Sequence, residues 1–290
     1  MTWFLLSLGA ALTQAVQFAV VKGRARAIPP LVIVAWTQSV ACLVWIVYFL
    51  VSGHPFTAPG SIWPAVAASC GLVLGMSGLL ARASARGDIS IVGPILALSP
   101  LFTILPDAAL SGGLPSALGW VGLALSLTGT VNLSGADAVG RLGRVRALFK
   151  RGDALDALGA AFLLGFLAAV DRYGARHLGP PSYLVVTHGG TALLATVTAL
   201  ITTPRGLADS LAPRNLVTVM SHGLLGVTGT GMQTSALTMA PAAYVNAIRR
   251  MSAVLAVLLG RALFGEPDLA RRLTAALLAC AGAACLLLAR

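Results

Sequence analysis

Apolar residues fill the chain almost from end to end, in ten stretches of about 17–23 positions that are bounded by charged residues, Pro or Gly. A helix of about 20 apolar residues spans the ~30 Å hydrocarbon core of a bilayer, and a soluble domain does not need ten such segments. The pattern therefore predicts an all-α integral membrane protein with ten transmembrane helices. The predicted helices cover residues 2–21, 30–52, 62–84, 89–110, 117–134, 154–174, 181–202, 214–236, 241–263 and 270–288.

The composition of the 290 residues supports this class. Of these residues, 57% are hydrophobic and only 10% are charged, whereas about a quarter of a globular protein is charged. The chain has no GxxxxGK[ST] loop and no dinucleotide-binding fingerprint, so transport energy would have to come from gradients. The four cysteines lie in apolar stretches without partners of metal-site spacing, so we expect free thiols, no metal and no cofactor. These are Cys42, Cys70, Cys280 and Cys285.

The basic residues lie on one side of the predicted bundle. Fifteen of the 20 Lys and Arg residues fall in or beside the loops after helices 1, 3, 5, 7 and 9, and three fall on the other side. Because Lys and Arg accumulate in cytoplasmic loops, we predict both termini outside the cell and the 135–153 linker in the cytoplasm. This topology explains the net charge of +11 without nucleic acid. The first helix has no preceding positive charge, so it is expected to be a retained span rather than a cleaved signal.

The chain repeats itself at a constant shift of 153 residues. The matching pairs are Gly78 with Gly231, Ala83 with Ala236, Ser99 with Ser252, Gly112 with Gly265 and Gly129 with Gly282. The shift divides the chain into a five-helix repeat over 1–134, the basic linker 135–153 and a second repeat over 154–290. Because five is odd, the second repeat enters the membrane from the opposite face. Two inverted five-helix repeats are typical of alternating-access transporters, although a channel or a membrane enzyme can also contain a duplication.

Two segments resemble the EamA type of the drug/metabolite transporter superfamily. They are GDISIVGP at 87–94, which runs into Ser99-Pro100, and AYVNAIRRMS at 243–252, which runs into FGEP at 264–267. A Pro-Pro pair also precedes or opens the second helix of each half. The resemblance implies a ten-helix carrier of small metabolites, often an exporter, with a central cavity and helix hairpins as gates. It also implies cytoplasmic termini, which the loop charges contradict; we follow the charges.

Polar residues inside the spans are the candidates for substrate binding, because such groups usually face a cavity or one another. Arg249 and Arg250 lie roughly 12 Å into their helix and about 100° apart around it. Alternatively, either arginine ties its helix to a carboxylate or to backbone carbonyls, the glutamines join helices, and Trp36 only packs. The expected substrate-binding residues are Gln14, Gln17, Trp36, Gln38, His188, Gln233, Tyr244, Asn246 and Arg249.

Asp107, Asp171 and Arg250 are the candidates for ion pairing or coupling. An Asp171–Arg249 pair and an Asp107–Arg250 pair are both consistent with the predicted depths. A carboxylate that is protonated during the transport cycle would couple transport to protons. Asp171 can instead reach interfacial water from its helix end. Tyr183 and Trp63, also near helix ends, are interpreted as residues of the interfacial aromatic belt.

The fourth predicted helix contains Pro94, Pro100 and Pro106 at six-residue spacing. Each proline removes a backbone hydrogen bond and can kink the helix, so we expect these residues to serve gating.

The sequence therefore predicts a secondary active transporter that moves a small polar organic metabolite by alternating access, with proton coupling as an option, in a bacterial-type cytoplasmic (inner) membrane. The family resemblance implies export as the direction. The alternative is a flippase for a lipid or lipid-linked amphipathic substrate. Enzyme activity is not expected, because no His, Cys and Asp cluster has catalytic spacing. The expected partners are the solute and membrane lipid, in a monomer or homodimer, and no nucleic acid.

Overall fold

The structure is a computed structural model. It describes residues 1–24, 28–53, 56, 59–86, 95–96, 98–111, 114–133 and 152–252, together with residues 255, 274, 277–278, 281–282, 284–286 and 288–289. Within these ranges every regular element is helical, which agrees with the predicted all-α class. Pro94, Cys280 and nearly all of the linker lie outside the described residues, as does most of the predicted helix 270–288.

In the first half, the helices are α1 (Thr2–Arg24), α2 (Pro30–Ser52), the short 3-10 helix η1 (Gly60–Ile62), α3 (Trp63–Arg86), α5 (Ser99–Ser111) and α6 (Ala117–Leu133). The second half contains α8 (Gly152–Leu178), α9 (Pro180–Thr202), α10 (Pro204–Ser210), α11 (Pro213–Met239) and α12 (Ala242–Arg250). Most ends agree with the predicted spans to within a few residues. Among the described residues, α10 and the first two residues of η1 occupy segments that we expected to be loops.

Proline and glycine define several of these ends. Pro30, Pro180, Pro204 and Pro213 stand in the first turn of their helices, where a missing N–H leaves no hydrogen bond unmade. Gly53 closes α2 in the left-handed region at φ 62°, and its N–H donates to the Phe49 carbonyl at 3.1 Å. Gly179, at φ 77°, makes the sharp turn from α8 into α9.

Two predicted helices are interrupted within their described parts. The predicted helix 89–110 has a turn at Leu98 before α5 begins at Ser99, and the predicted helix 241–263 has a turn at Met251 directly after α12. Pro100 contributes to the first interruption, because it has no N–H to donate to the carbonyl of Leu96 in the preceding turn. The two turns are separated by the same 153 residues as the sequence matches.

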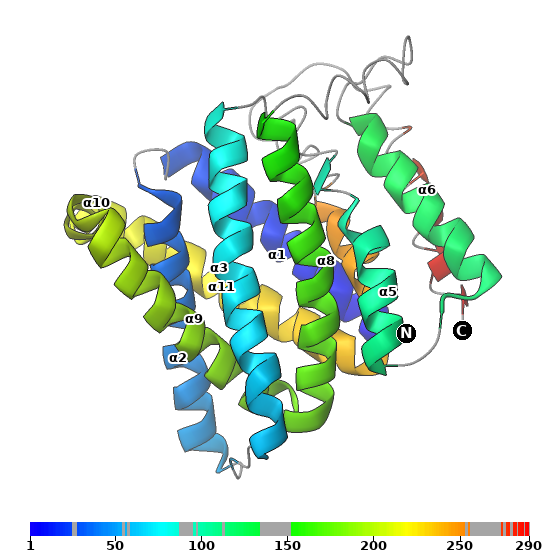
Figure 1. Ribbon diagram of the computed structural model, residues 1–290, viewed down its shortest axis with the longest axis horizontal. Coiled ribbons are helices and arrows are strands. Elements are labelled where there is room, and N and C mark those ends of the chain that lie inside the picture. Colours follow the sequence, from blue (N-terminus) through cyan, green and yellow to red (C-terminus); the bar gives the residue numbers. More distant parts are fainter. Residues whose placement is uncertain are drawn as a thin grey trace.

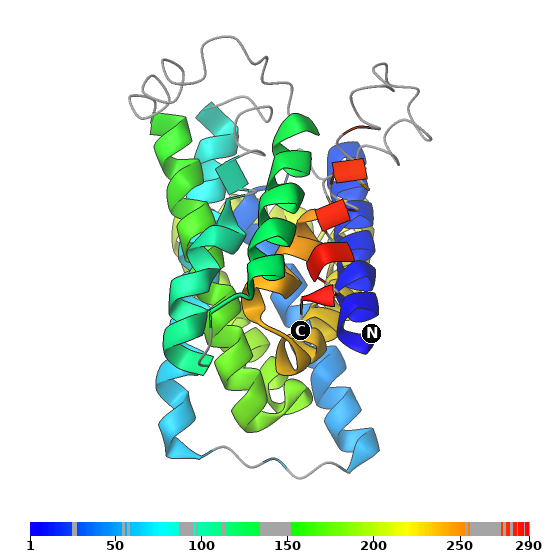
Figure 2. The same cartoon turned by 90° about the vertical axis from the view of Figure 1, so that its right-hand side faces the viewer.

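The helices pack into one bundle in which elements from the two halves alternate (Figure 1). The most extensive contacts join α3 to α8, α1 to α11 and α2 to α9. Both chain ends lie at one side of the bundle, while α6 ends and α8 begins at the opposite side (Figure 2). Trp3 shares a buried cluster with Leu286 and Ala289, which confirms that the described C-terminal residues lie beside the start of α1.

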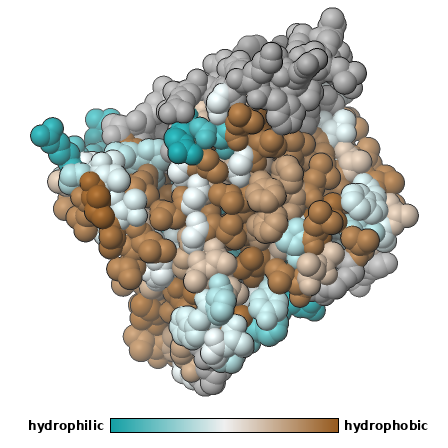
Figure 3. Space-filling model, viewed as in Figure 1, coloured by the Kyte–Doolittle hydropathy of each residue, from teal (hydrophilic) through white to brown (hydrophobic). Residues whose placement is uncertain are grey.

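The bundle is apolar on its outside as well as in its core. Within the described part of the chain, four helices, Pro30–Ser52, Gly60–Leu80, Ala154–Leu178 and Pro180–Thr202, are long and apolar enough to cross a membrane. Large hydrophobic side chains such as Leu50, Val51 and Ile201 are exposed, and brown hydrophobic surface dominates the face in Figure 3. A soluble monomer rarely exposes so much contiguous apolar surface, whereas lipid covers it without cost.

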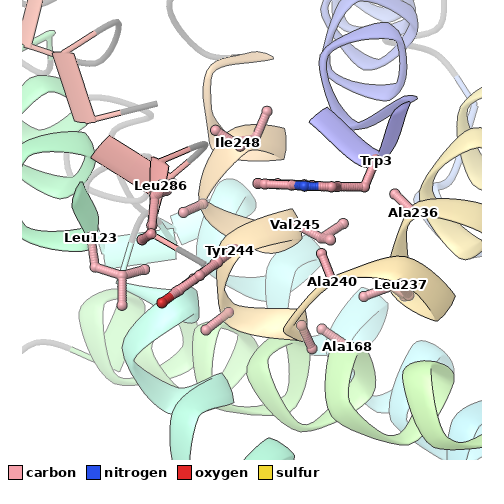
Figure 4. Packing of buried hydrophobic residues seen from close by; sticks show 14 of the residues in the cluster. Trp3, Leu123, Ala168, Ala236, Leu237, Ala240, Tyr244, Val245, Ile248 and Leu286 are labelled. Atoms are coloured by element: carbon pink, nitrogen blue, oxygen red, sulfur yellow. The ribbon is translucent and has the colours of Figure 1, made fainter. Parts of the chain in front are cut away.

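The largest buried cluster surrounds the start of α12 (Figure 4). Trp3 from α1, Leu123 from α6 and Leu237 from α11 pack around Val245 and Ile248. This cluster fixes α12 among five other helices and the described C-terminal residues, and so determines where its polar residues point.

Candidate functional site

A row of polar side chains joins α1 and α2 of the first half to α9 and α11 of the second. We call this row the polar seam; its members are Gln17, Thr37, Gln38, His188, His222 and Thr230. Gln17 Nε2 donates to the His222 carbonyl at 3.0 Å, and the Thr37 hydroxyl lies 2.9 Å from His222 Nδ1. His188 contacts Gln38 through Nδ1 and lies 3.4 Å from the Thr230 hydroxyl through Nε2. Hydrogen bonds of this kind hold helices together in an apolar environment.

The arginine pair, Arg249 and Arg250, lies at the end of α12, next to the turn at Met251. Arg249 Nε donates to Gln14 Oε1 on α1 at 3.0 Å, and the hydroxyl of Ser252 lies 3.3 Å from the same oxygen. Arg250 Nε is buried and has no hydrogen-bond partner among the residues that the structure describes. The pair thus brings two guanidinium groups into the interior, only one of which has a fixed hydrogen-bond acceptor at Nε.

Asp171 on α8 accepts hydrogen bonds from two hydroxyl groups. Ser69 on α3 donates to Oδ1 at 2.7 Å, and Tyr183 on α9 donates to the same oxygen at 2.8 Å. Arg249 is near enough to act on the charge of Asp171, but no hydrogen bond or salt bridge joins the two side chains among the described residues, so an Asp171–Arg249 pair stays a prediction. The Asp171 carboxylate therefore connects α8 to α3 and α9 and lies within electrostatic range of Arg249.

Asp107 on α5 forms an ion pair, but its partner is an arginine other than Arg250. Its Oδ1 lies 2.7 Å from Nη1 of Arg172 on α8, and both side chains are buried. Its Oδ2 accepts from the N–H of Ala242 at 2.8 Å, at the start of α12. An Asp107–Arg250 pair is therefore wrong. Tertiary packing brings α8 against α5 and leaves Arg250 at the far end of α12, eight residues from the amide that Asp107 caps.

Two of the expected ligand-wall residues lie elsewhere. Trp36 donates from Nε1 to the Ser210 hydroxyl at 2.8 Å and packs beside α10, so it holds that short helix in place. Tyr244 lies in the cluster around α12, where its hydroxyl accepts from the N–H of Ser116 at 3.3 Å. It also lines a cavity of about 430 Å³ near the chain ends. That cavity is lined by Trp3, Leu114, Ser116, Met239, Ala240, Pro241, Tyr244, Leu286 and Ala289.

The remaining candidates are buried between helices. Asn246 donates from Nδ2 to the Thr103 hydroxyl on α5 at 3.0 Å, and Gln233 is buried on α11. Asn246 thus joins α12 to α5, as an alternative to facing a solute.

The prolines of the fourth predicted helix have separate roles in the structure. Pro100 stands in the first turn of α5, whereas Pro106 lies inside the helix and is buried. Only Pro106 therefore removes an intrahelical bond from α5, at the carbonyl of Phe102.

Sequence reasoning missed Ser69, Tyr183 and Arg172. Tyr183 is only 1% exposed, so its assignment to the interfacial belt is wrong, whereas Trp63 is 48% exposed at a helix start. Tyr183 packs so closely against α8 that a Cβ on Gly174 would overlap its ring. A glycine opposite a tyrosine was a signal for such an approach, but nothing in the sequence showed that these two positions face each other.

The site can bind through hydrogen bonds and charge. Among the residues that the structure describes, no group of three or more His, Cys, Asp and Glu side chains could hold a metal ion. Cys42, Cys70 and Cys285 are free thiols, as expected.

Comparisons with known proteins identify the family. Residues 1–135 match the sequence profile of the EamA-like transporter family. The first half of the chain is therefore similar to an EamA-like transporter. The resemblance to the EamA type of drug/metabolite transporter is confirmed for these residues, and the long apolar helices of the described residues are those of a multi-pass membrane protein.

A solved structure described as "Crystal structure of protein" is similar over 99% of this chain and 97% of its own, with a TM-score of 0.76 and 22% identity. At that identity the similarity shows the fold alone. No curated protein matches the chain in sequence.

Proposed function

We propose that this EamA-type protein is a secondary active transporter that exports a small polar organic metabolite by alternating access. One observation carries the proposal. Asp171 lies within electrostatic range of Arg249, beside Arg250, inside a helical bundle whose outside is apolar. Ionisable groups inside a membrane are costly and are usually retained for a solute or ion pathway.

The helix packing supports two inverted repeats within a ten-helix bundle. If α1, α2 and α3 correspond to α8, α9 and α11, exchanging the halves turns the α1–α11 contact into the α8–α3 contact and maps α2–α9 onto itself. These are the three most extensive contacts. The interruptions at Leu98 and Met251 occupy corresponding positions, and interrupted helices in corresponding positions are typical of transporter binding sites.

The topology that we propose places both termini outside and the 135–153 linker in the cytoplasm of a bacterial-type inner membrane. The support is the excess of Lys and Arg in the loops on the linker side. Arg82, Arg205 and Arg214 are exposed at that end of the described bundle.

Proton coupling would involve Asp171. Its neighbours from the surrounding helices are Ser69 and Cys70 on α3, Tyr183 on α9 and Arg249 on α12. Protonation would weaken its attraction to Arg249 and release that guanidinium to a solute.

The proposal is tested with purified protein in liposomes. Vesicles are preloaded in turn with an amino acid mixture, nucleobases, organic cations or sugar phosphates, and exchange of the labelled solute is measured with and without an imposed pH gradient. We expect exchange of one class, lost in Arg249→Ala and retained in Arg82→Gln. Exchange that is equal in Arg249→Ala and wild type would show that the arginine pair does not serve transport.

A flippase remains the second candidate, because the 430 Å³ cavity beside Tyr244 is lined mainly by apolar side chains that suit an alkyl chain. Movement of a fluorescent phospholipid between leaflets, without exchange of any soluble class, would favour this function.

A further inference from the structure

We propose that Arg250 is the anion-binding group of this carrier and that the solute carries one net negative charge, held as a carboxylate or phosphate group. The inference rests on the proposed transport function and names its substrate class.

The first argument is a charge imbalance in the interior. Of the nine acidic residues, Asp107, Asp156 and Asp171 lie within predicted spans. Asp156 lies near a helix end and pairs with Arg82, whose side chain is 57% exposed. The charged groups that lie deeper in the spans are three arginines and two aspartates, so one positive charge is in excess. These residues are Arg172, Arg249, Arg250, Asp107 and Asp171. A charge without a counter-ion is costly in a membrane interior, so a bound monoanion would restore neutrality.

The second argument identifies which arginine carries the excess. Asp107 neutralises Arg172 at 2.7 Å, and Asp171 interacts with Arg249. Arg250 has a charged neighbour in Arg249, of like sign, and its buried Nε has no partner. Arg172 Nε also lacks a hydrogen bond, but the guanidinium of Arg172 already has its carboxylate. Arg250 is therefore the guanidinium that is free to take an anion.

The third argument is position. Arg250 is the last residue of α12 and directly precedes the turn at Met251, one of the two corresponding interruptions. The equivalent position in the first half, 153 residues earlier, is Ala97, so the duplicated segment carries the charge in one half only. A planar guanidinium binds carboxylate and phosphate oxygens through two parallel N–H bonds, which suits a solute that must bind and leave.

A stability experiment on the unliganded protein decides whether Arg250 is an open site or a structural group. Arg250→Met keeps the length of the side chain and removes its charge. We expect the apparent Tm in detergent to rise by about 3 °C or more, because a partly buried charge that has no counter-ion among the described residues is lost. Arg172→Met is the matched control and should lower the Tm, because it leaves Asp107 unpaired. A fall in Arg250→Met similar to that in Arg172→Met would overturn the proposal.

A ligand experiment on the wild-type protein tests the charge class without depending on a variant. Each anion is compared with a neutral or zwitterionic partner of similar shape: benzoate with benzamide, N-acetylleucine with its amide, glucose 6-phosphate with glucose, and lysophosphatidylglycerol with lysophosphatidylcholine. The glucose 6-phosphate comparison is made at about pH 5, where the phosphate monoester carries about one negative charge. We expect one anion to raise the apparent Tm and its partner not to. The affinity for that anion should fall about 30-fold or more in Arg250→Met, and be unchanged in Arg82→Gln.

The outcomes separate the sources of the anion. Stabilisation by benzoate, N-acetylleucine or glucose 6-phosphate supports a soluble solute, and stabilisation by lysophosphatidylglycerol alone supports the same anion site with a lipid headgroup. Equal stabilisation by both members of every pair, or by none of the four anions, would overturn the proposal. These experiments measure binding and not transport. The proposal of an anion site and the proposal of export can therefore be supported or overturned independently of each other.

Discussion

The carboxylate of Asp107 connects three helices near the end of the bundle where the chain termini lie. It accepts from Arg172 on α8 through one oxygen and caps the first amide of α12 through the other. Both side chains of the ion pair are largely inaccessible, at 6% and 10% exposure, so the pair is not screened by solvent. Removing one partner of such a pair costs more than removing both, because the remaining charge stays buried.

We therefore expect Asp107→Asn to destabilise the protein by about 3–5 kcal/mol, seen as a large fall in apparent Tm in detergent. Adding Arg172→Met should recover part of the loss, because it removes the stranded guanidinium. Arg82→Gln, at the exposed pair with Asp156, should change stability by less than about 1 kcal/mol. If Asp107→Asn melted like the wild type, the ion pair would not hold α5, α8 and α12 together.

At the scale of the elements, α5 is distinguished by a proline in the interior of a short helix. Pro106 is buried one residue before Asp107 and leaves the Phe102 carbonyl without its helical donor. Helix α5 also crosses α8 closely, since a Cβ on Gly165 would overlap the backbone of Phe102. The bend at Pro106 therefore lies between the tight α5–α8 crossing and the Asp107 ion pair.

Pro106→Ala should restore the missing bond and stiffen α5. If α5 bends during transport, the exchange rate in liposomes should fall severalfold while the apparent Tm stays the same or rises. Pro213→Ala is the matched control, because Pro213 lies in the first turn of α11, where no intrahelical N–H is needed. Equal rates for wild type and Pro106→Ala would show that α5 does not need this bend.

At the scale of the whole molecule, the bundle has a basic side and a side that carries both chain ends. Figure 2 shows the linker side opposite the N and C termini. The loop between α2 and η1 lies on the side of the termini, and the α10 segment lies on the linker side (Figure 1). The excess of Lys and Arg favours the linker side as the cytoplasmic side, whereas the family resemblance implies that the two termini lie in the cytoplasm.

Labelling in intact cells tests this orientation. In a background with all four cysteines replaced by Ser, Ser61→Cys and Ala212→Cys each introduce one thiol at an exposed residue. We expect a membrane-impermeant maleimide to label Ser61→Cys in intact cells and Ala212→Cys only after permeabilisation. The reverse pattern would place the termini in the cytoplasm and contradict the charge count.

The sequence by itself determined the all-helical membrane class, most helix ends and the positions of the free thiols. These features depend on local properties: the length of apolar runs, proline in a first turn and glycine at positive φ. The family also followed from short motifs, since it is marked by residues adjacent in the chain. The interruption before α5 was foreseeable too, because Pro100 acts on its own neighbours.

Only the tertiary structure decided which polar groups meet. The sequence placed Asp107, Asp171 and the three arginines within reach of one another by depth, but pairing also depends on which face each helix turns to its neighbours. Asp107 pairs with Arg172, Asp171 is held by Ser69 and Tyr183, and Trp36 faces α10, each because residues more than ten positions apart are brought together by packing. The depth of a residue in the membrane follows from its position along its helix. The neighbouring helix toward which its side chain points depends on how the whole bundle packs.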